Sequence, residues 1–106
     1  MAVVELFRAL GDPSRLEMVR RLSGGEFHTI TSVSNGLEIT RQGARKHLQI
    51  LADAHLIIFE SRGRDTGVRL DRDTLEEGRA FIAELEHRWD KRLEALRRFV
   101  DDEQGD

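Results

Sequence analysis

The sequence of 106 residues contains no cysteine, a single proline and only 6% aromatic residues. The absence of cysteine excludes disulfides, thiolate metal ligands and thiol redox switches. No apolar run approaches the length of a membrane-spanning helix, and the N-terminus lacks a signal-peptide pattern. We therefore expect a cytoplasmic protein without a membrane partner, whose length fits one domain over residues 1–106.

Charge is abundant but unevenly distributed along the chain. The net charge is −3, with 35% charged residues. Residues 40–70 carry six basic and three acidic side chains, whereas residues 71–106 carry seven basic and twelve acidic ones. A basic segment in an acidic protein is compatible with a DNA-binding surface. On charge alone, an ordinary solvated surface explains the pattern equally well.

Two short helices are predicted at the N-terminal end. Apolar residues across 3–10 predict the first helix, and Gly11 ends it. Asp12 followed by Pro13 is typical of a helix start, because Asp caps free backbone N–H groups and Pro suits the first helical position. Apolar residues at helical spacing extend this second helix to about Leu22.

Two further helices are predicted before residue 55. Residues 29–35 favour a short third helix, and Thr40 is a suitable N-cap for a fourth helix that runs to about Ala54. One face of the fourth helix is apolar. Its other face carries Arg41, Gln42, Arg45, Lys46 and Gln49.

A change of periodicity after residue 55 indicates β structure. The apolar run 56–59, two glycines and the segment 68–70 predict a two-stranded hairpin with a basic tip. A long final helix follows from about Asp73 to Val100. The expected fold is mainly α with a small β-hairpin, in the order of four helices, hairpin and fifth helix, which is the winged helix-turn-helix layout.

The fourth helix is the predicted recognition helix. Arg41, Gln42, Arg45 and Lys46 lie at spacings that place them on one face. Arg can donate two hydrogen bonds to guanine and Gln can pair with adenine in the major groove. Thr40 and Lys46 suit phosphate contacts, as does the helix N-terminus. The alternative is a solvent-facing basic helix without a target.

The hairpin tip contains Arg62 and Arg64 on either side of a glycine. In a wing, these side chains would contact the DNA backbone and supply affinity without reading the sequence. The alternative is a plain polar turn.

The final helix has an apolar seam that predicts a dimer interface. Leu6 and Phe7 of the first helix would add to it. The seam lies at spacings of three, four and seven and consists of Leu75, Ile82, Leu85, Trp89, Leu93, Leu96 and Val100. The alternative is that this helix folds back on its own domain.

Catalysis and cofactor binding find no support. The sequence has no phosphate-binding glycine loop and no nucleophile motif. Its four histidines, His28, His47, His55 and His87, show no metal-ligand spacing. We expect no enzyme activity, no catalytic residue and no cofactor. We expect His47 to pack or form hydrogen bonds near the recognition helix, and His55 to lie at a helix end.

Several segments together resemble the ArsR family of transcriptional regulators, over about residues 5–100. The segment Phe7–Leu16 resembles the family's opening motif, and Ile39–Leu48 resembles the start of its recognition helix. The stretch Gln49–Ile57 and the segments Arg62–Arg64 and Val68–Asp71 are similar to its continuation into the wing. The resemblance implies a homodimer formed by the first and last helices, which represses transcription by binding an approximately palindromic operator.

The resemblance also implies residue roles. Base contacts would fall to Arg41, Gln42, Arg45 and Lys46. Thr40 would cap the helix and touch phosphate, while Arg62 and Arg64 would serve the wing. The cysteine pair of the family's metal sensors is absent, as is the ligand spacing of others on the last helix. The chain therefore resembles a metal-independent branch. It departs from the family's pattern at Gly43, where alanine is commoner.

These observations predict a sequence-specific, dimeric DNA-binding repressor without a metal site. Its partners would be double-stranded DNA and a second copy of the chain. An effector-responsive sensor of the same fold, with a small-molecule or protein effector, is one alternative. A winged-helix module for protein–protein interaction is another, although such a surface usually exposes aromatic residues or Met rather than Arg, Gln and Lys.

Overall fold

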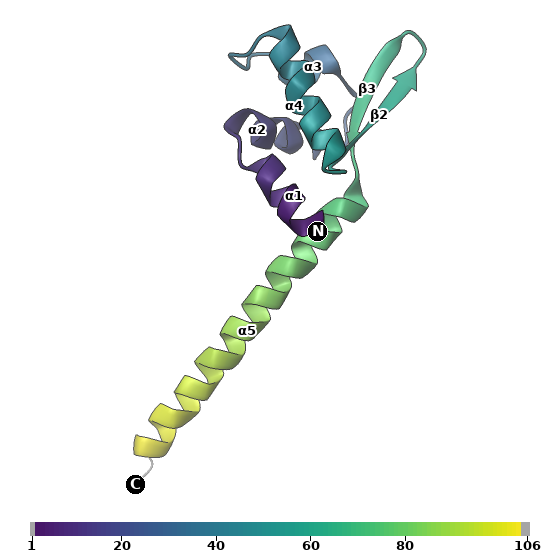
Figure 1. Cartoon of the computed structure of the whole chain (residues 1–106). Coiled ribbons are helices and arrows are strands. Elements are labelled where there is room, and N and C mark those ends of the chain that lie inside the picture. Colours follow the sequence, from purple (N-terminus) through teal and green to yellow (C-terminus); the bar gives the residue numbers. More distant parts are fainter. Residues whose placement is uncertain (1, 105–106) are drawn as a thin grey trace.

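The computed structural model, which describes residues 2–104, divides into a small folded part and a long protruding helix (Figure 1). Four short helices and a β-sheet form the folded part. The last helix, α5, extends from it as a rod, so that the molecule measures 74 × 26 × 25 Å. Helix α1 starts at the junction of the two parts, and α5 ends at the far end of the rod.

The four predicted short helices are confirmed. They are α1 (Ala2–Leu10), α2 (Pro13–Leu22), α3 (Ile30–Ser34) and α4 (Arg41–Asp53). Their ends agree with the expected ones to within one residue. The agreement is close because local signals in the sequence mark several of the helix ends. One such signal is Asp12, whose carboxylate accepts hydrogen bonds from the backbone N–H groups of Ser14 (2.9 Å) and Arg15 (3.1 Å).

The sheet has one strand more than the sequence predicts. Strands β2 (Ile57–Arg62) and β3 (Asp65–Leu70) form the expected hairpin, with Arg62 paired to Asp65 at its tip. A short strand, β1 (His28–Thr29), pairs antiparallel with the other edge of β3, so the order is β1-β3-β2. The predicted hairpin is thus confirmed, and β1 is an additional strand that the sequence analysis did not predict. Two residues are too few to show the alternation by which a strand is recognised.

The core lies between α4, the other short helices and the sheet. Ala44, Leu48 and Leu51 of α4 follow one another at spacings of four and three, and all three are buried. Their packing fixes the orientation of α4 and thereby turns its polar face to solvent. The largest fully buried side chains are Leu6, Met18, Val33, Leu48, Leu51 and Leu56.

Helix α5 (Arg72–Gln104) is longer at both ends than the predicted Asp73–Val100. It contacts α1 near its start, where Leu6 packs against Gly78 and Phe7 lies beside Phe81 with ring centroids 5.8 Å apart. From residue 79 to residue 102 every side chain is exposed. The helix therefore does not fold back on its own domain, and the alternative raised above is wrong.

Candidate nucleic-acid interface

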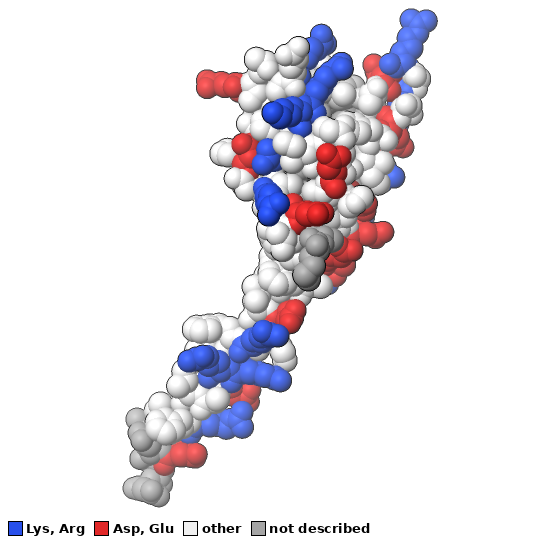
Figure 2. Space-filling view, viewed as in Figure 1, with Lys and Arg blue, Asp and Glu red and all other residues white. Residues whose placement is uncertain are grey.

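The N-terminal half of α4 presents the predicted polar face to solvent. Thr40, Arg41, Gln42, Arg45 and Lys46 are all exposed, and no described carboxylate lies within 4.0 Å of their charged groups. Ala44 and Leu48 anchor the opposite side in the core. Figure 2 shows Lys and Arg side chains at the end of the folded part away from α5. This end combines α4 and the hairpin tip.

Thr40 begins α4 as expected. Its side-chain oxygen accepts a hydrogen bond from the backbone N–H of Gly43 at 2.9 Å. A Cβ added to Gly43 would lie 3.1 Å from that same oxygen, which is closer than most real contacts. Glycine, a poor helix former, thus leaves room for the cap at this position.

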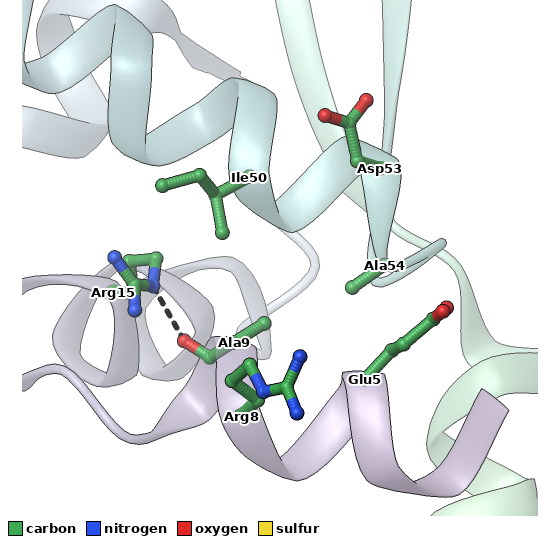
Figure 3. Close-up of a pocket in the computed structure, with 7 residues that line it drawn as sticks. All are labelled: Glu5, Arg8, Ala9, Arg15, Ile50, Asp53 and Ala54. Carbon is green, nitrogen blue, oxygen red and sulfur yellow. Dashed lines mark hydrogen bonds between the residues drawn. The ribbon is translucent and has the colours of Figure 1, made fainter. Parts of the chain in front are cut away.

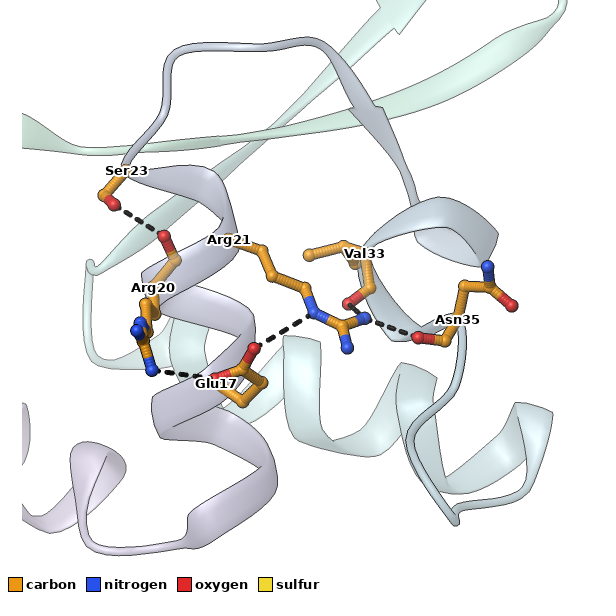
Figure 4. A network of polar contacts seen from close by, with 6 residues as sticks. All are labelled: Glu17, Arg20, Arg21, Ser23, Val33 and Asn35. Carbon is orange, nitrogen blue, oxygen red and sulfur yellow. Dashed lines mark hydrogen bonds and ion pairs between the residues drawn. The ribbon is translucent and has the colours of Figure 1, made fainter.

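Arg21, a partly buried residue of α2, connects α2 to the end of α3, the helix that precedes α4 (Figure 4). The guanidinium of Arg21, on α2, donates to the backbone oxygens of Val33 (3.1 Å) and Asn35 (2.6 Å). Glu17 lies 3.4 Å from the same guanidinium and orients it. Carbonyl groups at a helix end lack intrahelical partners, so a cation there is favourable. Arg21 was not predicted as important, because the two carbonyl groups to which it donates lie 12 and 14 residues further along the chain.

A second arginine connects α1, α2 and α4. Arg15 donates from Nε to the backbone oxygen of Ala9 (2.6 Å; Figure 3) and from its terminal nitrogen to Nδ1 of His47 (3.1 Å). Nδ1 of His47 also lies 3.8 Å from the carboxylate of Asp12. The expectation that His47 forms hydrogen bonds near the recognition helix is confirmed. The cluster fixes the back of α4 against the two preceding helices.

The carboxylate of Asp12 should make acid stability depend on pH. The backbone N–H of Arg15 is the main cause that lowers the pKa of Asp12 below 3.8, and the nearby His47 and Arg15 add to it. A lowered folded-state pKa stabilises the protein above the unfolded-state pKa, and this contribution is lost as the pH falls through the folded-state value. Asp12→Ala is expected to lower the free energy of unfolding by about 1 kcal/mol at pH 7.

Urea denaturation at several pH values measures this effect. The gap between wild type and Asp12→Ala should shrink below about pH 4. Asp12→Asn is the matched control, because asparagine also caps helices but carries no charge. At pH 7 its stability should lie between those of wild type and Asp12→Ala, and its difference from Asp12→Ala should stay constant as the pH falls, since neither replacement titrates. A gap for Asp12→Ala that stays constant down to pH 3 would contradict this role of the carboxylate.

The wing arginines occupy the tip and outer part of the hairpin. Arg62 ends β2 and Arg64 follows Gly63, whose φ of 61° allows the tight turn; both arginines are exposed. A third arginine of the hairpin, Arg69, lies 3.4 Å from the carboxylate of Glu60 and is partly neutralised by it. The hairpin therefore presents its unneutralised positive charge near the tip.

The predicted dimer residues separate into two groups. Leu6 is only 2% exposed and belongs to the chain's own core. The side chains of Phe7 and Ile82 remain 36% and 44% exposed, respectively. They lie at one end of the exposed apolar seam of α5. The exposed members of this seam further along are Leu85, Trp89, Leu93, Leu96 and Val100.

A shallow cleft of about 380 Å³ lies behind α4, between it and helices α1 and α2 (Figure 3). Ala9, Ile50 and Ala54 form its apolar part. Glu5, Arg8, Arg15 and Asp53 surround it with charges of both signs. Within residues 2–104, no three His, Asp or Glu side chains come together as a metal site would require. No described helix has the length and apolar character needed to cross a membrane.

Comparisons with known proteins agree with this architecture. The family described as helix-turn-helix domain matches residues 10–58, from the end of α1 into β2. No curated protein matches the sequence. Solved structures, in contrast, match nearly the whole chain.

One similar structure is an ArsR-like transcriptional regulator from Rhodococcus sp. RHA1, which is 26% identical with a TM-score of 0.77, over 92% of either chain. An ArsR family transcriptional regulator, 25% identical with a TM-score of 0.75, matches 84% of this chain and 91% of its own. The homodimeric winged helix-turn-helix DNA-binding domain of a possible ArsR-family regulator from Mycobacterium bovis has a TM-score of 0.61 at 19% identity, over 88% of this chain and 82% of its own.

The fold, the helix-turn-helix match and these structures define the class: the chain is a winged helix-turn-helix protein. Within that class the chain is similar to solved ArsR-family transcriptional regulators, in agreement with the resemblance drawn from the sequence.

Proposed function

We propose that the chain is a dimeric, sequence-specific DNA-binding repressor that acts in the cytoplasm and needs no resident metal. The main support for this proposal is that α4 packs its apolar side against the core and exposes a set of polar side chains, namely Arg41, Gln42, Arg45 and Lys46. An α-helix of this kind fits the major groove, where such side chains read base edges. An interaction module would instead expose aromatic residues on this face.

The remaining DNA-contact residues have supporting roles in this proposal. Thr40 and the N-terminus of α4 contact a phosphate, which sets the depth of the helix in the groove. Arg62 and Arg64 contact the backbone beside the major-groove site. Such contacts add affinity and make binding salt-dependent, because each neutralised phosphate releases a counterion.

We propose that two copies associate through the exposed seam of α5, with Phe7 and Ile82 at the end nearest the folded part. Leu6 contributes only indirectly, since it is buried between α1 and α5. The M. bovis domain of similar fold is homodimeric. A two-fold axis would place two recognition helices about 34 Å apart, in successive major grooves. Occupancy of the operator would then block transcription.

Independence from metal is supported by the absence of cysteine from the sequence. Isothermal titration calorimetry of the purified protein with zinc chloride is expected to give no saturable heat at micromolar metal, and zinc should leave DNA affinity unchanged. Saturable binding that also alters DNA affinity would make the protein a metal sensor. Cadmium serves as the control for a softer metal.

Comparison of binding to the chain's own upstream DNA and to a scrambled duplex tests the proposed function. The native sequence should be preferred. Equal binding to both duplexes would contradict specific recognition.

A further inference from the structure

The ring of Phe27 lies against Gly67 of strand β3, at a position where the strand carries no side chain. Gly67 of β3 pairs with Glu60 of β2 and with Thr29 of β1. A Cβ added to Gly67 would overlap the ring of Phe27, whose Cζ atom would lie 2.8 Å away. The ring thus occupies the space that any other residue at position 67 would fill. Phe27 nevertheless remains 40% exposed, so it is not simply a core residue.

The ring of Phe27 also contacts Arg62, one of the proposed DNA-contact residues of the wing. The guanidinium carbon of Arg62 lies 4.4 Å from the centroid of the Phe27 ring, within the range of a cation–π interaction. A guanidinium that stacks through its flat face keeps its N–H groups in the plane free to donate. The contact with Phe27 and a contact with a phosphate are therefore compatible.

We propose that Phe27 is a positioning residue for the wing, which holds the guanidinium of Arg62 in place to contact the DNA backbone. This inference rests on the proposed function. Arg62 has no carboxylate within 4.0 Å among the described side chains, unlike Arg69, which pairs with Glu60. Stacking on an aromatic ring orients the arginine without neutralising the charge that a phosphate requires. Gly67 makes this arrangement possible, because it leaves room for the ring.

A measurement without DNA tests whether Phe27 holds Arg62. In the NMR spectrum of the free protein, side-chain protons of Arg62 should be shifted upfield by the ring above which they lie. Phe27→Leu keeps an apolar cover over Gly67 but has no ring, so the shift should disappear. Side-chain resonances of Arg64 serve as the internal control and should not move. Unshifted Arg62 protons in the wild type would overturn the proposal.

A double-mutant cycle with DNA tests whether this contact matters for binding. Phe27→Leu is expected to weaken binding about two- to five-fold. In an Arg62→Ala background it should cause no further loss, whereas in an Arg64→Ala background the loss should persist. An equal loss in the Arg62→Ala background would show that Phe27 acts through the fold instead of Arg62, and would overturn the proposal.

Gly67→Ala is a second variant, which leaves Phe27 itself unchanged. Its added methyl group displaces the ring of Phe27, so both the resonance shift and the extra affinity should be lost. Circular dichroism of each variant checks that the sheet is intact. If the wild-type protein binds no DNA, the proposed function fails, while the resonance shift still decides whether Phe27 holds Arg62.

Discussion

Leu93→Glu is expected to convert the protein from a dimer into a monomer and to weaken operator binding by at least about 100-fold. Leu93 lies in the middle of the α5 seam and is 46% exposed in a single chain. Burying a leucine side chain contributes about 1.5–3 kcal/mol. A symmetric interface loses this contribution twice, and a desolvated carboxylate adds a further cost. Loss of about 3 kcal/mol corresponds to about 100-fold in the dimerisation constant.

Multi-angle light scattering coupled to gel filtration measures this change directly. Ala95→Glu is the matched control, because it introduces the same charge about 200° further around the helix. Residue 95 is also exposed in the single chain. This control should remain dimeric and bind DNA normally. If Leu93→Glu stays dimeric, the seam does not form the interface. Far-UV circular dichroism separates dissociation from general unfolding.

Arg45→Ala should weaken binding to the operator by about 1–3 kcal/mol and relax the preference at one base pair. Arg45 is exposed on the polar face of α4 and is not ion-paired to any described carboxylate. Its guanidinium can donate two hydrogen bonds to one guanine, so truncation removes a sequence-dependent contribution. The loss should therefore be smaller on operators in which that base pair has been changed.

Competition binding with a set of single-base operator variants measures this specificity. Arg88→Ala is a suitable control: it removes the same charge from α5, where Arg88 is paired with Glu84 at 3.1 Å. Equal weakening by Arg45→Ala on all sequences would assign Arg45 to phosphate contact. That outcome would remove it from the proposed base-reading residues.

Local signals explain why most of the fold could be predicted from the sequence. Asp12–Pro13 and Thr40 define helix starts through hydrogen bonds to residues two or three positions away. The spacing of Ala44, Leu48 and Leu51 determines which face of α4 is buried, and hence which side chains remain exposed.

Contacts between distant parts of the chain explain what the sequence did not reveal. Strand β1 forms because it pairs with β3, which lies about forty residues later in the sequence. The position of Arg15 against His47 and of Phe27 against Gly67 also depends on tertiary packing. Leu6 was predicted to lie in the dimer interface, yet the start of α5 covers it within the same chain. The only sign of the contact with Phe27 in the sequence was Gly67 itself, because a glycine within a strand often marks a place where another group approaches the backbone closely.

Fluorescence anisotropy of the purified protein on two labelled duplexes measures whether the protein recognises a DNA sequence. One duplex carries the DNA upstream of the protein's own coding sequence, and the other carries the same bases in scrambled order, each at two salt concentrations. We expect tight binding to the native duplex, about 10³-fold or more in preference to the scrambled one, and weaker binding at higher salt. Equally weak binding to both duplexes would contradict this expectation.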